Sequence, residues 1–428
     1  MKPLAIDLFC GAGGMSEGVL QAGFHIIYSN DISKDAAMTY KLRHEQLGLI
    51  QGKNTWLEID DIRNITYKKI QSRINALTDF KNKNIKINAI FGGPPCQGFS
   101  RAGKQKEEDI RNTLFKEYIR LVGEINPDYL VFENVPGILD IKFKKFDSIF
   151  DKEIYINNSA IDIIRKELKK IDYNILEYNL LNAADYGVPQ NRYRIILIAY
   201  KKNCKKPQYP KAKGKIITIT DALNDIIYGE LTTDYQRDSI KGRTRNIITN
   251  ETISSTVLHN NDKTKHKSYI RERFELFQEG ETVDQLRKRI YNDGICLEDK
   301  PNLVNFISNK LGIEKYDVIK LFKEKSFTKK EVDLLLTKKV SRVKLSKKQP
   351  SCTILTLPDD IISPFENRIF SVRELARLQS FDDSFVFYGK RTTGSENRKK
   401  ETPQYTQVGN AVPPLLARAI AKEIIKCI

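Results

Sequence analysis

Short apolar runs that end at glycine turns constrain the fold of this chain more than any other feature. Residues 4–9 have the composition of a buried strand and lead into the turn Cys-Gly-Ala-Gly-Gly at 10–14, which precedes a helical stretch. Residues 25–30 resemble a second strand ending at Asp31. A glycine turn before a helix N-terminus favours an anionic or carboxylate ligand, and an acid after the next strand can accept ribose hydroxyl hydrogen bonds. The amino-terminal part therefore predicts a nucleotide-type pocket.

The same alternation continues through the first two hundred residues. Apolar runs with the character of strands occupy 87–91, 129–132, 174–178 and 194–199, and helical spacing is found over 113–125 and 158–170. Strands that alternate with helices indicate a doubly wound, mostly parallel α/β domain. Ligands of such sheets collect beyond the carboxyl ends of the strands. The residues that fall at these ends are Gly11, Asp31, Cys96 and Glu133.

One cysteine stands in an unusual setting, the segment Gly-Gly-Pro-Pro-Cys-Gln-Gly-Phe-Ser at 92–100. A lone cysteine is most often a small buried hydrophobe. Here two prolines fix φ before the thiol, and two glycines allow backbone or ligand to approach closely. Cys96 is therefore expected to project from a loop at the sheet's carboxyl edge, where nucleophiles are often held.

Six motifs together resemble those of the DNA (cytosine-5) methyltransferases of bacterial restriction-modification systems. The resemblance runs from Asp7 to beyond Pro414, keeps the family's order, and is interrupted only in the middle third. The motifs are Asp7–Gly14, Pro94–Ser100, Phe132–Val135, Asp185–Arg194, Val372–Gln379 and Gly409–Pro414. A motif of the Asp-Pro-Pro-Tyr kind, which would indicate methylation of an exocyclic nitrogen, is absent from the sequence.

The resemblance implies a covalent mechanism on a cytosine flipped out of the duplex. It assigns Cys96 to addition at C6, Glu133 to N3 and the exocyclic amine, and Arg194 to O2. Arg192 would support the active-site loop, and nearby positive charge would lower the thiol pKa. The substrate-binding positions carried over are Pro95, Gln97 and Ser100.

The implied cofactor is S-adenosylmethionine, with S-adenosylhomocysteine as product and no metal. Phe9 would stack near the adenine, Asp31 would bind the ribose, and Asp61 with Ile62 would lie at the adenine edge. For Asp31 and Asp61 the alternative interpretation is a solvated loop carboxylate. The remaining cofactor positions are Gly11, Gly13, Asn410 and Val412. Cys10, at a position that is alanine in some members, is interpreted as a packing residue.

Composition agrees with a soluble, cytoplasmic enzyme. The 428 residues include 40% hydrophobic residues, and the six cysteines form no C-x-x-C pair. Neither a signal-like segment nor a membrane-length apolar run is present. The net charge of +18 lies mostly after residue 200, as expected for a partner such as double-stranded DNA. The alternative explanation is a lysine-rich composition that results from an AT-biased genome.

A Lys/Pro run at 201–214 marks the most plausible domain boundary. We expect a catalytic and cofactor-binding domain at 1–204, a smaller, irregular target recognition domain at 205–366, and a returning segment at 367–428. Within the middle part, 252–257 and 350–354 resemble strands, and the helical stretch 314–336 resembles an insertion.

Two other functions remain open at this stage. An RNA cytosine-5 methyltransferase of the tRNA type shares much of the motif set, although the large basic segment between Arg194 and Val372 favours a DNA-reading domain. A non-catalytic, methyltransferase-like binding protein is disfavoured because Cys96, Glu133 and Arg194 are retained. We further expect a monomer, with a cognate restriction endonuclease as a possible partner acting on the same site.

Overall fold

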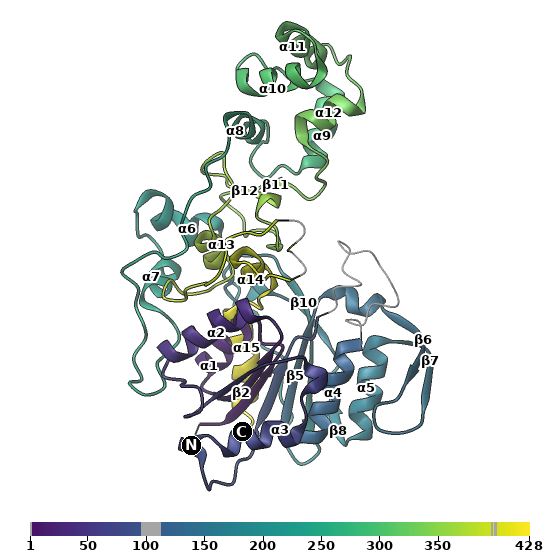
Figure 1. The fold of residues 1–428 in the computed structure, drawn as a ribbon, viewed down its shortest axis with the longest axis vertical. Coiled ribbons are helices and arrows are strands. Elements are labelled where there is room, and N and C mark those ends of the chain that lie inside the picture. The colour runs from purple at the N-terminus through teal and green to yellow at the C-terminus, as the bar shows by residue number, and fades with distance from the viewer. Residues whose placement is uncertain (1, 96–112, 395–396, 398–399) are drawn as a thin grey trace.

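A large sheet lies in the lower half of the view in Figure 1. The computed structural model describes residues 2–95, 113–394, 397 and 400–428. Within those ranges the sheet has eight strands in the order β3-β2-β1-β4-β5-β10-β8, and β9 also pairs with β10. The strands are β1 (Leu4–Leu8), β2 (His25–Asp31), β3 (Trp56–Ile59), β4 (Ala89–Gly92), β5 (Tyr129–Asn134), β8 (Tyr173–Ile175), β9 (Asn179–Asn182) and β10 (Tyr193–Lys201).

The five strands from β3 to β5 are parallel, whereas β10 is antiparallel to β5, β8 and β9. Every residue of β1, β4 and β5 is buried, as is typical of parallel strands covered on both faces. The helices of this part are α1 (Gly14–Ala22), α2 (Lys34–Gln46), α3 (Tyr67–Asn75), α4 (Leu114–Ile125) and α5 (Ala160–Lys170). The predicted doubly wound, mostly parallel α/β fold is confirmed.

The two faces of the sheet have separate hydrophobic cores. On one face, Ala5, Phe91 and Val131 pack with residues of α1 and of α15 (Pro414–Ile425). On the other face, Ile6, Ile90 and Leu130 pack with residues of α3, α4 and α5. Because successive side chains of a strand point to opposite faces, each strand contributes to both cores.

The carboxyl-terminal helix returns to the start of the chain, and two glycines of α1 permit the contact. A methyl group at Gly14 would lie 2.3 Å from the carbonyl oxygen of Val412, and one at Gly18 would lie 2.4 Å from the Cβ of Ala417. The two helices therefore pack with almost no side-chain volume between them at these positions. This packing places the last motif of the sequence beside the glycine turn that begins at Cys10.

A hairpin that the sequence patterns did not predict lies between β5 and α5. Its strands are β6 (Lys142–Asp147) and β7 (Ile154–Ser159), which pair antiparallel. Phe146 stacks on Phe115 of α4 with 5.4 Å between ring centroids, and the buried Tyr155 hydrogen bonds to Glu167 of α5. The hairpin therefore covers α4 and α5 on their outer side.

The middle segment, expected to be irregular, contains helices. α6 (Ile219–Tyr228) and α7 (Asp234–Lys241) contribute Leu223 and Tyr235 to the core that contains Ala5. A second group, which Figure 1 shows beyond the sheet at the far end of the molecule, has its own core around Leu286, Ile307 and Phe322. These helices are α8 (Ser268–Glu275), α9 (Val283–Asp293), α10 (Pro301–Leu311), α11 (Lys315–Lys323) and α12 (Lys329–Leu336).

The helical stretch expected at 314–336 is present as α11 and α12. The prediction of strands at 252–257 and 350–354 is wrong, since each segment makes only one isolated β-bridge, through Thr252 and Ser351 respectively. At Ile354, side chains replace a strand partner: the amide donates to Gln190, and the carbonyl accepts from Arg192. The remaining elements are β11 (Val343–Lys344), β12 (Ile361–Ile362), α13 (Val372–Leu378) and α14 (Gln404–Asn410).

Among the described residues, no helix combines the length and the apolar character that crossing a bilayer requires.

The packing of α1 on α15 predicts the effect of one added methyl group. We expect Gly18→Ala to lower the free energy of unfolding by about 1–3 kcal/mol, because the new Cβ would meet Ala417 and the backbone of α15. Urea denaturation followed by circular dichroism measures this loss. Gly394→Ala is the control, since no atom of the residues that the structure describes lies within 4 Å of its added Cβ; equal stability of the two variants would contradict the close approach.

Candidate active site

The register of the sheet brings the predicted site residues to one edge. Leu8 of β1 pairs with Gly92 of β4 and with Asn30 of β2, and Gly92 pairs with Phe132 of β5. The residues that follow these positions, Phe9, Gly93, Asp31 and Glu133, are therefore neighbours at the carboxyl ends of four adjacent strands. The sequence prediction of a site at this edge agrees with the arrangement.

A buried ion pair lies at the centre of this edge. Arg194 Nε donates to Glu133 Oε1 at 2.8 Å, and both side chains are about nine-tenths buried, at 9% exposure each. The antiparallel pairing of β10 with β5 opposes Ile196 to Glu133 and so places Arg194 near the carboxylate. Burial lowers the pKa of Arg194, and the neighbouring Glu133 opposes that shift. Arg194 also donates to the carbonyl of Tyr193 at 2.8 Å, so its guanidinium is fixed.

The second carboxylate oxygen of Glu133 faces the entrance of the cysteine loop. A methyl group at Gly93 would lie 2.7 Å from Glu133 Oε2, so only glycine leaves room for the carboxylate there. Asn134 Nδ2 donates to the carbonyl of Pro94 at 3.0 Å, which ties the end of β5 to the same loop. Pro95 is the last described residue before the gap, and Cys96, Gln97 and Ser100 lie outside the described residues.

Arg192 does not contact Glu133. Its guanidinium donates to the carbonyl of Ile354 at 3.1 Å and to that of Gly409 at 2.9 Å, and the side chain is buried. Burial, followed by the positive charge of Arg194, lowers the pKa of Arg192. The sequence predicts that Arg192 supports the active-site loop; among the described residues it instead joins β10 to two segments that are distant in sequence.

The glycine turn after β1 has the backbone that a close ligand requires. Phe9 has φ 58°, a left-handed conformation that is uncommon for a bulky residue and is often found at functional sites. Gly11 and Gly13 have φ 54° and 101°, and no atom of the described residues lies within 4 Å of a Cβ added at Gly11. The described part of the chain therefore leaves space beside Gly11, directly before the N-terminus of α1.

Asp31 closes the other side of this turn. Its carboxylate accepts hydrogen bonds from the backbone amides of Gly11 and Ser33, both at 2.8 Å. Burial raises the pKa of Asp31, while these backbone hydrogen bonds oppose the shift. This arrangement fits a nucleoside cofactor that carries a carboxylate. The free backbone amides at the N-terminus of α1 can bind the cofactor's carboxylate, and the Asp31 carboxylate can accept hydrogen bonds from its ribose hydroxyls.

The other predicted cofactor residues lie around the same edge. Ile62 is buried, and Asp61 forms an ion pair with Arg63 at 2.5 Å, which lowers the pKa of the Asp61 carboxyl. Val412 contacts the first residue of α1 through its carbonyl, and Asn410 is the exposed last residue of α14. The structure thus brings the motif at 409–414 next to the glycine turn at 10–14. The Asp61 carboxylate is bonded to Arg63 in this conformation.

Sequence reasoning missed two parts of the site region. Gln190 donates to Gln379 at 2.8 Å, and Gln379 donates to the carbonyl of Val408 at 2.8 Å, so α13 and α14 are joined to the segment before β10. Asp7 is buried in β1, where its Oδ2 accepts from Ser16 Oγ at 2.5 Å. An acidic residue within an otherwise apolar run was the signal that could have singled out Asp7.

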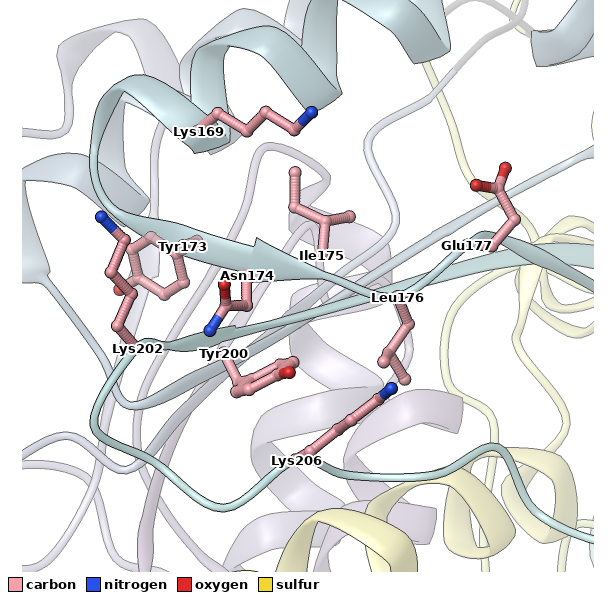
Figure 2. A pocket seen from close by; sticks show the side chains of 9 residues that line it. All are labelled: Lys169, Tyr173, Asn174, Ile175, Leu176, Glu177, Tyr200, Lys202 and Lys206. Atoms are coloured by element: carbon pink, nitrogen blue, oxygen red, sulfur yellow. The ribbon is translucent and has the colours of Figure 1, made fainter.

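A surface pocket of about 510 Å³ lies elsewhere on the molecule. Figure 2 shows that its walls come from the strands β8 and β10 and from the end of α5, with Tyr173 and Tyr200 between Lys169, Lys202 and Lys206. It adjoins the end of β10 that is remote from Arg194, so it contains none of the predicted site residues. Within the described ranges, no group of three or more His, Cys, Asp or Glu side chains is arranged to hold a metal ion.

Comparison with known proteins defines the class of this site. The model of the C-5 cytosine-specific DNA methylase family matches residues 4–426. The type II methyltransferase M.DdeI of Desulfomicrobium norvegicum is 30% identical over 98% of this chain and 88% of its own length. M.XorII of Xanthomonas oryzae pv. oryzae is 29% identical over 100% of this chain and 85% of its own.

The fold likewise has solved counterparts. A prophage-encoded protein from Escherichia coli that carries the description DNA modification methyltransferase superposes with a TM-score of 0.64, at 23% identity and 99% coverage of both chains. A methyltransferase of Entamoeba histolytica gives 0.55 at 14% identity, over 100% of this chain and 98% of its own. The chain thus shares its fold with these two proteins. The chain belongs to the C-5 cytosine-specific DNA methylase family.

The contacts of Arg192 lead to a prediction for stability. We expect Arg192→Lys to lower the free energy of unfolding by about 1–3 kcal/mol, because a single ammonium cannot reproduce both guanidinium bonds and a buried carbonyl is left unpaired. Urea denaturation gives the value. Arg165→Lys, in an exposed pair with Glu177, should change stability by less than about 0.5 kcal/mol; equal effects would show that the Arg192 bonds contribute nothing.

Proposed function

We propose that this enzyme transfers a methyl group from S-adenosylmethionine to C5 of a flipped-out cytosine in duplex DNA, through a covalent bond between Cys96 and C6. The observation that carries the proposal is the buried Glu133–Arg194 pair, whose carboxylate faces Gly93 at the entrance of the loop that continues to Cys96. An acid, a guanidinium and the approach to a thiol at one sheet edge are the groups that nucleophilic addition to a cytosine ring requires.

Each group has a defined task in this proposal. The Cys96 thiolate adds to C6, and the electron density that reaches the ring is relieved at N3 by a proton or strong hydrogen bond from Glu133, which must carry a proton on its second carboxyl oxygen for this step. The methyl group arrives at C5 from the cofactor, which supplies an electrophilic methyl on sulfur. The C5 proton is then lost to a water molecule, N3 returns its proton to Glu133, and the thiolate leaves C6, which restores the aromatic ring.

Arg194 is a positioning group for the carboxyl as well as a ligand for the base. Because it holds Oε1, the other oxygen is directed towards Gly93 and the loop. Its remaining guanidinium nitrogens can donate to cytosine O2, as the family resemblance suggests. Pro95, Gln97 and Ser100 are proposed to contact the substrate in the same loop.

The residues around the first glycine turn are proposed to hold the cofactor. The amides at the N-terminus of α1 would bind the carboxylate of the methionine part, and Asp31 would accept from the ribose. Phe9 would stack near the adenine, with Asp61 and Ile62 at its edge, and Gly11 and Gly13 would allow close approach. The Asp61 carboxylate is paired with Arg63 in this structure.

Duplex DNA is the proposed substrate because the relatives named above are type II methyltransferases and because the chain carries a net charge of +18. We propose that 205–366 reads the bases as a target recognition domain, that 1–204 and 367–428 form the catalytic part, and that α11 and α12 are an insertion. A monomer acting in the cytoplasm, beside a restriction endonuclease of the same specificity, completes the proposal.

Two variants test the assignment of the catalytic groups. We expect Cys96→Ala to abolish methyl transfer while DNA affinity stays within about threefold, since the thiol takes part only in the chemistry. Glu133→Gln should lower the rate by about 10²–10⁴-fold, the usual contribution of a general acid. Transfer of a radiolabelled methyl group to plasmid DNA measures the activity of both variants. The same assay with tRNA shows which of the two nucleic acids is the substrate.

Lys34→Ala, on the α2 surface, is a matched control that should keep wild-type activity. Normal turnover by Cys96→Ala would contradict the covalent mechanism, and labelling of tRNA alone would contradict the DNA substrate.

A further inference from the structure

Asp7 is a buried acid for which the proposed mechanism has no task. Its side chain in β1 is 1% exposed, and its Oδ2 accepts from Ser16 Oγ at 2.5 Å. Ser16 Oγ lies 2.9 Å from Tyr40 Oη, which lies 2.5 Å from Ser29 Oγ. Among the described residues, no lysine or arginine forms an ion pair with Asp7. A buried carboxylate normally has such a partner, because desolvation of an isolated charge is costly.

The surroundings of Asp7 are neutral or negative. Burial raises the pKa of Asp7 to about 7, and the charge of Asp31 adds to the increase, while the hydrogen bond from Ser16 opposes it. The titratable groups that interact with it from the turn, α2 and α4 are Cys10, Tyr40 and Tyr118, and burial raises the pKa of each of them. On α1, Glu17 is already paired with Arg43 of α2 at 2.8 Å, so that arginine is committed to another acid.

This acid lies at the base of the proposed cofactor cradle. Asp7 stands two residues before Phe9 on β1, and its partner Ser16 is the third residue of α1. The turn from Cys10 to Gly13 crosses between these two elements, with Asp31 bonded to Gly11 on its far side. A ligand in the cradle would therefore bind next to a carboxyl that has no counter-cation among the described residues.

We propose that Asp7 acts as the counter-charge for the positive sulfur of S-adenosylmethionine and so favours this cofactor over the uncharged thioether product. The inference rests on the proposed cofactor and adds a discrimination between the substrate and product forms. Removal of the methyl group removes the positive charge, so an ionised Asp7 stabilises the complex before transfer and not after it. The residue would thereby assist exchange of product for fresh cofactor.

The sign of the pH dependence follows from the raised pKa. Below pH 7 Asp7 is mostly protonated, and the cofactor gains little from it; above pH 7 it is ionised, and the sulfonium gains most. If the cation lowers the pKa by one unit, affinity for S-adenosylmethionine rises about five- to tenfold between pH 6 and pH 8.5. Affinity for S-adenosylhomocysteine should change far less over the same range.

Isothermal titration of the full chain with each compound at pH 6 and pH 8.5 tests the proposal. In the wild type, the ratio of the two affinities should rise with pH by about five- to tenfold. In Asp7→Asn the ratio should be independent of pH, and the loss should fall on S-adenosylmethionine alone. Asp31→Asn is the matched control: it should weaken both compounds by similar factors, because the ribose is common to both.

Thermal unfolding without ligand gives a second readout. A folded-state pKa above the unfolded value means that the ionisation of Asp7 removes stability as the pH rises towards and through 7. The melting temperature of Asp7→Asn should therefore exceed that of the wild type by an amount that increases from pH 5.5 to pH 8.5. A purely structural role predicts a lower melting temperature at both pH values.

The outcomes separate this inference from the function on which it rests. If the wild type binds neither compound, the proposed cofactor is wrong and the inference falls with it. If the wild type binds both with a ratio that does not vary with pH, or if Asp7→Asn weakens both equally, only the role of Asp7 is overturned.

Discussion

The register of the parallel strands is the constraint on which the rest of the structure depends. Backbone hydrogen bonds align Leu8, Gly92 and Phe132 across β1, β4 and β5. Because the alignment is made at the strand ends, the residues that follow are brought together regardless of their separation in sequence. A shift of one residue in any pair would turn the side chains of that strand to the opposite face. Glu133 would then no longer point towards Gly93 and Arg194.

Side chains near this edge also join it to segments far along the chain. Arg192 bonds to Ile354 and Gly409, and Gln190 bonds to Gln379. These bonds are buried and mostly involve backbone carbonyls, which would otherwise lack partners and cost about 1–3 kcal/mol each. The segments that follow helices α8 to α12 in sequence are thus anchored within a few residues of the Glu133–Arg194 pair. Helices α8 to α12 have a separate core, which also includes Ile362 and Ile369 of the segment that follows them.

Much of the catalytic part could be predicted from the sequence, because its signals are local. Continuous apolar runs gave β1, β2, β4 and β5, and glycine turns gave the cradle at Gly11 and Gly13. The prediction of a strand at 350–354 is wrong because the side chains of Gln190 and Arg192, remote in sequence, form hydrogen bonds with the backbone amide and carbonyl of Ile354. Short helices of 8–11 residues such as α8 and α9 carry too few turns for a clear period. The lack of a cationic partner for Asp7 among the described residues depends on groups that are remote in sequence. The only local sign of it in the sequence is one acidic residue within an apolar run.

The proposed function is transfer of a methyl group to one cytosine of a short DNA sequence, with Cys96 as the nucleophile. Bisulfite sequencing of DNA from cells that express the wild type, beside cells that express Cys96→Ala, tests this most directly. Protected cytosines within one recurring short sequence, absent with the variant, are the predicted result. Protection that is missing from the wild type, or that persists with Cys96→Ala, would contradict the account.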